Sequence, residues 1–255
     1  SNIGVTSNTD VAVFAAAADA DAITQIEFAA LATLAGPSAT ITSGAGNTIN
    51  VNTGDTTAID SVSLVAGGAG NVTVSGLTGD DLCIEAGTGS VSLDTAANTL
   101  DYLTVSASSS IGQTAAGTII INGSGDANLT ATAAITLGAD NNFTTTTVNA
   151  SGSNITLNDI NAIGLGAVAA TGDLVVTAGG TITDTAGSQI SVGGTTSLRA
   201  ERGGDFFDIQ LDNANTHVFT GAIDMLGEDI FLDNSIATNL RSVTTNDASA
   251  ATTDS

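Results

Sequence analysis

Short apolar segments that alternate with polar positions dominate the chain from residue 38 onward. Triplets such as ITL, LVV, TIT and ISV recur about every eight or nine residues, separated by Gly, Asn, Asp or Ser. A period of two places one side of each strand in a core and the other side in water. The pattern therefore predicts many short β-strands, with no helical periodicity after residue 37.

The same chain carries a long internal repeat. Segment 103–125 aligns with segment 174–194 at an offset of 71 residues, which places Ile111 on Ile182 and Ile119 on Ile190. Farther along, 135–143 aligns with 209–219, and 154–159 aligns with 229–234 at an offset of 75. Strands this short bury their apolar side only by stacking coil upon coil.

The repeat predicts an all-β fold, a parallel β-solenoid over residues 38–243 with eight or nine coils. One repeat unit would hold three coils of ~24 residues, each with two or three strands. Ile155, Leu157, Ile230 and Leu232 would then be stacked equivalents in the core. Small polar residues that stack at the turns, such as Asn and Thr, would form hydrogen-bonded ladders.

The two ends differ from the repetitive region. Residues 1–37 are rich in Ala, end on Gly36-Pro37, and place Ile23, Ile26, Ala30 and Leu34 at helical spacing. We interpret this segment as a helical or irregular cap on the solenoid, the alternative being a strand around Val11 and Val13 that docks on another subunit. Residues 244–255 would be a tail or the entry to a further coil.

The amino-acid composition restricts which binding partners are expected. Twenty-six acidic residues face three arginines and no lysine, a formal net charge of −23. Such a surface repels phosphate backbones and anionic lipids, so no nucleic-acid partner is expected. No apolar run approaches the ~18 residues of a membrane helix, so no membrane insertion is expected. Calcium is the ion we would expect if one binds, since Asp and Asn oxygens suit it.

Several residues could carry chemistry, and each has a structural interpretation. Cys83 is interpreted as a small core residue, and the single histidine, His217, as too distant in sequence to serve it as a catalytic base. The carboxylate pairs Asp80-Asp81, Asp205 with Asp208, and Glu228-Asp229 could act as acid and base. We expect no enzyme, because lysine is absent and aromatic residues are scarce.

One segment contains both charged and aromatic residues, namely Arg199, Glu201, Arg202, Asp205, Phe206, Phe207 and Asp208. It is interpreted as an inserted loop closed by local Arg–Asp pairs, with the two phenylalanines packed down, and alternatively as a ligand groove.

The repeat itself, GDLVVTAGGTITDTAGSQISVGGTTSL followed by DIQLDNANTHVFTGAIDMLGEDIFLDN, resembles the repeat regions of filamentous-haemagglutinin-like large bacterial exoproteins. The resemblance is clearest over 154–240 and weaker over 61–153. It implies a right-handed parallel β-helix, export to the bacterial cell surface, and a role as an adhesin stalk or contact fibre. The Asn-Pro-Asn motifs of that family's secretion domain are absent, and the only proline is Pro37.

Two function classes follow. The first is an extracellular structural or adhesive solenoid, either the stalk of an adhesin or a subunit that self-associates end to end into a filament, with cell-surface glycans or proteins as further partners. The second is a glycan-binding or polysaccharide-degrading β-helix. The uniform Thr, Ser, Asn and Asp composition of the outward positions favours the first.

Overall fold

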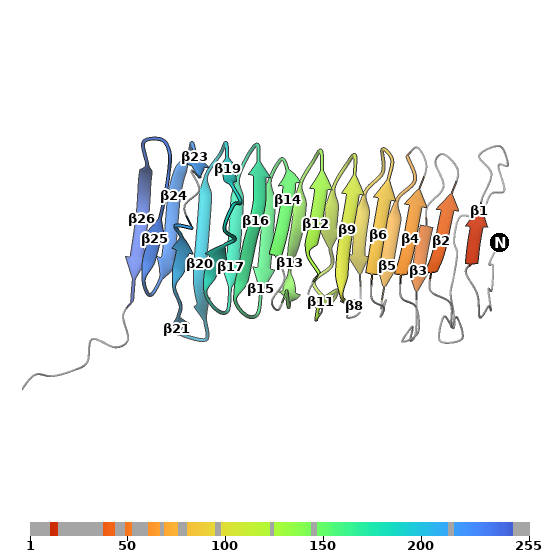
Figure 1. The fold of residues 1–255 in the computed structure, drawn as a ribbon, viewed down its shortest axis with the longest axis horizontal. Helices are drawn as coiled ribbons and strands as arrows, with labels where there is room; N and C mark the ends of the chain where they lie inside the picture. Colours follow the sequence, from red (N-terminus) through yellow and green to blue (C-terminus); the bar gives the residue numbers. More distant parts are fainter. Residues whose placement is uncertain are drawn as a thin grey trace, which may run out of the picture.

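The fold is an elongated solenoid of stacked parallel strands (Figure 1). The computed structural model describes residues 11–14, 38–43, 49–52, 61–66, 69–75, 81–94, 98–122, 125–143, 147–213 and 217–246. Within these ranges every regular element is a β-strand and none is a helix. The predicted all-β parallel solenoid is therefore confirmed.

Two sheets run along the rod. In order, the first contains β1 (Val11–Phe14), β2 (Ser38–Ser43), β4 (Ser61–Ala66), β6 (Asp81–Ala86), β9 (Tyr102–Ala107), β12 (Ala127–Ala131), β14 (Thr147–Gly152), β16 (Ile163–Ala170), β18 (Ile182–Asp184), β22 (Ile209–Leu211) and β25 (Ile230–Leu232), with β19 (Ile190–Val192) and β23 (Val218–Phe219) beside this path.

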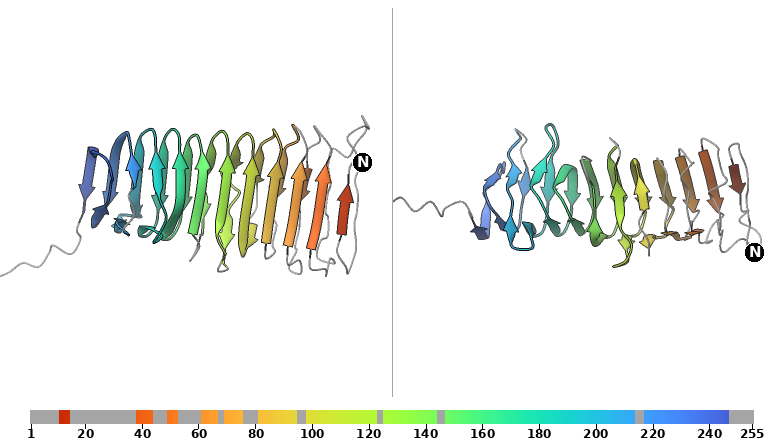
Figure 2. Two further views of the ribbon diagram at one scale, coloured as in Figure 1. Left: turned by 45° about the horizontal axis from the view of Figure 1, so that its top comes forward. Right: turned by 90° about the horizontal axis from the view of Figure 1, so that it is seen from below.

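The second sheet contains, in order, β3 (Ile49–Asn52), β5 (Val72–Ser75), β7 (Val91–Asp94), β10 (Ile111–Gln113), β13 (Ile135–Asn141), β15 (Ile155–Asp159), β17 (Leu174–Ala178), β20 (Thr196–Arg202), β24 (Ala222–Gly227) and β26 (Asn239–Thr245), with β21 (Asp205–Phe206) paired to β20. β8 (Asn98–Leu100) and β11 (Ile119–Ile121) form a separate pair. Most coils add one strand to each main sheet, and two coils add a split pair to the first sheet, β18 with β19 and β22 with β23. The two views of Figure 2 show the coils advancing along one axis.

Strict alternation decides which side chains enter the core. In β6, Leu82, Ile84 and Ala86 are buried whereas Asp81, Cys83 and Glu85 are exposed. Our prediction for Cys83 was therefore wrong: the thiol lies on the outer face, because its two apolar neighbours, Leu82 and Ile84, are both in the inward phase. Partial burial raises the pKa of the Cys83 thiol, and the charge of Asp81 raises it further.

The core is a set of stacked columns of medium-sized side chains. In the second sheet Val91, Ile111, Ile135, Ile155 and Leu174 occupy successive positions of one column, and each is at most 1% exposed. Burying such a side chain contributes about 1.5–3 kcal/mol. Because every coil presents the same column to the next, each coil is stabilised by both of its neighbours.

Polar ladders on the outside accompany the apolar columns. The Asn149 amide donates to Asn128 Oδ1 at 2.9 Å, and the Asn128 amide donates to the Tyr102 hydroxyl at 2.9 Å. At one row of turns, Asn154 Oδ1 accepts the Asp173 N–H at 2.9 Å, and Asp173 Oδ1 accepts the Thr195 N–H at 2.7 Å. The predicted ladders exist, and they include strand positions as well as turns.

The N-terminal segment is described only at Val11–Phe14. These residues form β1, which pairs in parallel with β2 of the same chain, Val11 opposite Ala39. The first sheet thus extends into the segment for which we predicted a cap or a strand docking on another subunit. The predicted helical pattern at Ile23–Leu34 lies outside the described residues, as do residues 247–255.

The internal repeat spans three and a half coils, which corrects our prediction of three. Leu103 lies in β9 of the first sheet, whereas its partner Leu174 lies in β17 of the second. The same exchange of sheets holds for Ile111 and Ile182. An offset of 71 residues over three and a half coils corresponds to about 20 residues per coil, instead of ~24.

Ile155 and Ile230 therefore are not stacked on each other. Ile155 and Leu157 are fully buried in β15, where they pair with Leu174 and Val176, whereas Ile230 and Leu232 lie in β25 of the other sheet and are only partly buried. They are equivalent by repeat and lie on opposite sides of the core. The predicted burial of all four was right for the first pair and incomplete for the second.

The described part of the chain contains no helix with the length and apolarity needed to span a bilayer.

Candidate assembly surface

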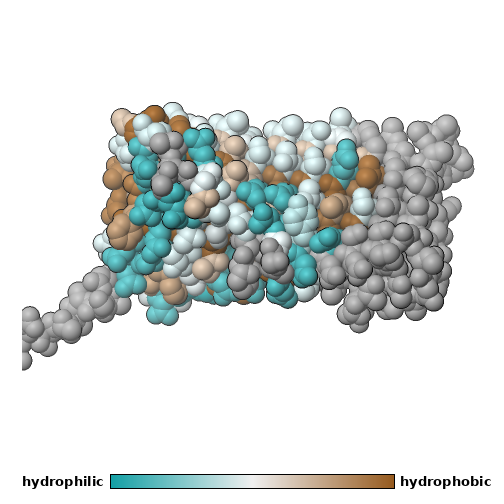
Figure 3. Space-filling model, in the orientation of Figure 1, coloured by the Kyte–Doolittle hydropathy of each residue, from teal (hydrophilic) through white to brown (hydrophobic). Residues whose placement is uncertain are grey.

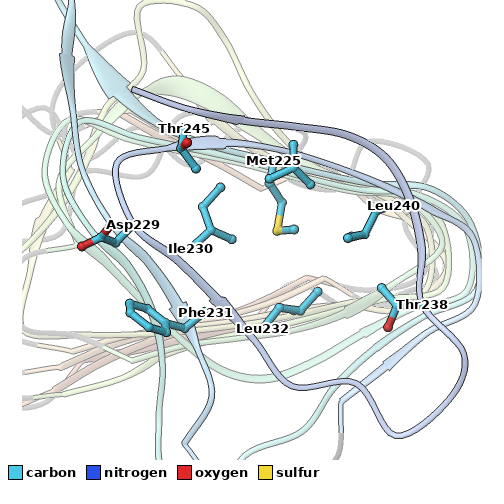
Figure 4. A pocket seen from close by; sticks show the side chains of 9 residues that line it. Met225, Asp229, Ile230, Phe231, Leu232, Thr238, Leu240 and Thr245 are labelled. Atoms are coloured by element: carbon cyan, nitrogen blue, oxygen red, sulfur yellow. The ribbon is translucent and has the colours of Figure 1, made fainter. Parts of the chain in front are cut away.

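Among the described residues, no strand covers the inner columns of the last coil. Met225, Ile230, Leu232, Leu240 and Val243 come from β24, β25 and β26 and surround an open depression of about 580 Å³. Figure 4 looks into this end of the rod, where the side chains of Met225, Ile230, Leu232 and Leu240 point into the space enclosed by the coil. We call these five residues the C-terminal face.

Two side chains of this face are far more exposed than the residues at the equivalent positions of the preceding repeat. Leu240 is 53% exposed and Val243 is 44% exposed. At an offset of 75 residues they correspond to Leu165 and Val168 of β16, which are at most 1% exposed. The difference arises because β18 and β19 cover β16, while no described strand covers β26.

Even the backbone of β26 repeats that of β16. The pairing of β14 with β16 shifts register after Val148↔Leu165, and the pairing of β24 with β26 shifts after Ile223↔Leu240. β26 therefore pairs with its neighbour in the same register pattern as β16, which is an internal strand. Figure 3 shows hydrophobic residues gathered at this end of the rod.

Around the rod the arginines are paired with acids. Arg241 binds Asp224 through both its Nε, at 2.9 Å, and its Nη2, and this pairing lowers the pKa of Asp224. Arg199 binds Glu201, and Arg202 lies 3.3 Å from Asp140. These are all three arginines of the chain, so the flanks present a surplus of carboxylates.

The charged stretch at 199–208 forms a small hairpin. β20 and β21 pair antiparallel around Gly203 and Gly204, whose positive φ angles of 66° and 96° suit a tight turn. Phe207 packs against the core. The interpretation as an inserted loop is right, but the ion pairs differ from the prediction: Arg199 binds Glu201, and Arg202 reaches Asp140 in another coil.

The candidate carboxylate pairs are spread along the rod. Asp80 lies outside the described residues, while Asp81 and Asp205 are exposed on β6 and β21. Asp208 accepts the Asp229 N–H at 3.2 Å and the Gln210 amide at 3.0 Å, which engages both of its oxygens in the turn. Among the described residues no group of three His, Cys, Asp or Glu side chains is placed to hold a metal ion.

His217 forms a buried polar cluster that our sequence analysis missed. Its Nδ1 accepts the Ile190 N–H at 3.1 Å, so Nε2 carries the proton. Nε2 lies 3.2 Å from Asp184 Oδ2 in a geometry that departs from a hydrogen bond, and both side chains are fully buried. The Asn213 amide donates to Asp184 Oδ1 at 3.0 Å.

This cluster has a counterpart in the first repeat. Gln113 aligns with Asp184, and Asn141 aligns with His217. Asn141 Oδ1 accepts the Ile119 N–H at 2.9 Å, as His217 Nδ1 accepts that of Ile190, and the Asn141 amide donates to Gln113 at 3.2 Å. The Asp–His pair therefore occupies a position that the first repeat fills with an amide pair, which has no acid–base chemistry.

A second buried polar position also repeats. Asp159 Oδ2 accepts the Phe143 N–H at 2.9 Å, and its equivalent, Asn234, accepts the Phe219 N–H at 3.2 Å. Burial raises the pKa of Asp159, an effect that the N–H groups of Asn161 and Phe143 oppose. Repeat alignment of these polar residues was the signal that could have identified both clusters.

Comparison with known proteins adds one match. A family model described as "Repeats of unknown function (DUF5649)" matches residues 152–225. No curated protein and no solved structure matches the chain.

Proposed function

We propose that the chain is a structural module of an extracellular bacterial surface fibre or adhesin, serving either as part of a long stalk or as the subunit of a filament. The function of such a module is to supply length and a stable surface. Cell-surface glycans or proteins would be the contacts of the complete fibre.

One observation carries the proposal: the long repeat rebuilds the polar and backbone details of the rod as well as its apolar core. The polar clusters at Asn141 and His217, and the register shifts in the pairing of β16 and of β26, occupy equivalent positions. Residues that would suggest chemistry elsewhere thus belong to a repeating scaffold. Repetition of this kind is what a fold selected for length requires.

The surface is consistent with an exported fibre. With 26 acidic residues and every arginine in an ion pair, rods repel one another along their flanks and stay soluble. The resemblance of residues 154–240 to large bacterial exoproteins supports the same location.

Immunogold microscopy tests the proposal. Antibodies raised against this chain should label intact cells of the source bacterium, with gold along fibres or stalks, and a deletion strain supplies the control. Labelling that requires cell permeabilisation would contradict a surface role. If the purified chain cleaves soluble polysaccharide, or binds it saturably, the glycan-binding or polysaccharide-degrading alternative is favoured instead.

A further inference from the structure

We propose that the buried pair Asp184 and His217 makes the second repeat sensitive to acid, so that the short strands β19 and β23 separate as pH falls. The inference goes beyond the proposed structural function, because it concerns a change within one molecule. It starts from a position that the two repeats fill differently, with Asp184 and His217 in the second repeat and with Gln113 and Asn141 in the first.

The pair lies where strands of the first sheet are interrupted. Asp184 is the last residue of β18, Ile190 is the first residue of β19, and His217 directly precedes β23. β19 and β23 pair with each other beside the main path of the sheet, near its end in Figure 1. The hydrogen bond from the Ile190 N–H to His217 Nδ1 joins the starts of these two strands, so its loss would loosen both.

Every atom of the pair that could take up a proton already faces an N–H group. His217 Nδ1 accepts the Ile190 N–H at 3.1 Å. Asp184 Oδ1 accepts the Asn213 amide at 3.0 Å, and Asp184 Oδ2 faces the Nε2–H of His217 at 3.2 Å. A proton on Nδ1 takes the lone pair that the Ile190 N–H uses, and a proton on Asp184 weakens an acceptor that these N–H groups face.

The surroundings of the imidazole leave no other partner for the displaced N–H. Asp184 attracts an imidazolium, but the proton can enter only at Nδ1, towards which the Ile190 N–H is already directed. Both side chains of the pair are fully buried, so water does not replace the lost acceptor. The closed form therefore resists protonation.

Asp184 is the charged group that faces His217 among the described residues. β19 faces the imidazole with a backbone N–H, and β23 faces it with the Phe219 ring, whose centre lies 6.0 Å away. On the adjoining turns Asp212 and Asp233 are exposed to water. The acid response of this region therefore depends on the buried pair itself.

The size of the response follows from proton linkage. When β19 and β23 separate, water reaches His217, and a histidine in water has a pKa of about 6.5. The open form then takes up a proton that the closed form does not, so acid favours opening. Between about pH 7.5 and about pH 5.5 the ratio of open to closed molecules should rise about tenfold.

Amide hydrogen exchange followed by NMR tests the inference at the Ile190 N–H. After correction for the intrinsic effect of pH on exchange, the protection of Ile190 should fall about tenfold over this interval. Ile119 is the internal control, because its N–H is bound by the Asn141 amide oxygen at 2.9 Å and should keep its protection. Unchanged protection of Ile190 would overturn the inference.

The double variant Asp184→Gln with His217→Asn is the matched control, since it installs the side chains of the first repeat. Ile190 in this variant should be equally protected at both pH values. A tenfold fall that also occurs in the variant, or at Ile119, would show that acid acts elsewhere in the rod and that the inference is wrong.

A second measurement needs no variant, so it decides the matter even if the double variant fails to fold. The nitrogen-15 chemical shift of His217 Nδ1 in the closed wild-type protein should remain that of an unprotonated nitrogen at about pH 5.5. A protonated Nδ1 together with a protected Ile190 amide would contradict the proposed competition between the two protons.

Discussion

Leu165 and Leu240 offer a direct measure of what a covering coil contributes to stability. Both are leucines at the same repeat position, just before the same register shift, and they differ in that one is fully buried and the other is 53% exposed. Replacing each with alanine removes the same atoms. Any difference in cost therefore reports what the strands that cover β16 contribute, since no described strand covers β26.

The expected magnitudes follow from burial. Leu165→Ala removes a fully packed side chain and leaves a cavity, which costs about 2–5 kcal/mol. For Leu240→Ala the three carbon groups removed are worth about 0.8 kcal/mol each when buried, and about half of their surface is already in water. Water also fills the space, so the cost should be about 1 kcal/mol.

Urea unfolding followed by circular dichroism measures both values. Dilute protein keeps the rods apart, and equal m-values allow the midpoints to be compared. Thr156→Ala, at a partly exposed outward position of β15, serves as a control and should change little. Equal costs for the two leucines, or a larger cost at Leu240, would refute the assignment of the C-terminal face as uncovered core.

Three further predictions concern the polar positions. His217→Ala should cost about 2–5 kcal/mol in urea unfolding, because it empties a fully buried site and leaves the Ile190 N–H without its acceptor. The double variant Asp184→Gln with His217→Asn, which copies Gln113 and Asn141, should cost clearly less, and the reverse order would contradict the repeat equivalence. Folding raises the pKa of Asp159, so the contribution of this group to stability is lost as pH rises through the folded pKa. Relative to Asp159→Asn, the wild type should therefore gain stability as pH falls from neutral into that range. Parallel pH profiles of the two proteins would contradict the raised pKa. The raised pKa of Cys83 predicts that the native thiol reacts with a maleimide more slowly near neutral pH than the unfolded chain does, and equal rates would contradict it.

Much of the fold was readable from the sequence, because alternation marks the inward residues one strand at a time. Ile155 and Leu157 were identified in this way and are fully buried. The sheet to which a strand belongs was not readable, since both sheets present the same alternation to the core. An offset of 71 residues therefore looked like whole coils, although it exchanges the sheets that hold Leu103 and Leu174.

The candidate surface was less predictable. Leu240 and Val243 have the same sequence pattern as any inward pair, and only their position in the last described coil leaves them exposed. Cys83 was misplaced because its apolar neighbours suggested a continuous buried run. His217 and Asp184 are 33 positions apart, and only the alignment with Asn141 and Gln113 connects them.

The central claim, a parallel stack with coils of about 20 residues, is tested most directly by a disulfide between neighbouring coils. Cys83 in β6 lies opposite Thr104 in β9, on adjacent parallel strands about 4.8 Å apart. Under mild oxidation, the Thr104→Cys variant should form a disulfide between position 104 and Cys83, detected by mass spectrometry of the digested protein. The Ser106→Cys variant, changed two residues farther along the same strand on the same outer face, should stay reduced, because the Cα at that position lies beyond the ~7 Å that a disulfide spans. A disulfide in the Ser106→Cys variant and none in the Thr104→Cys variant would contradict the register and with it the stacking of the coils.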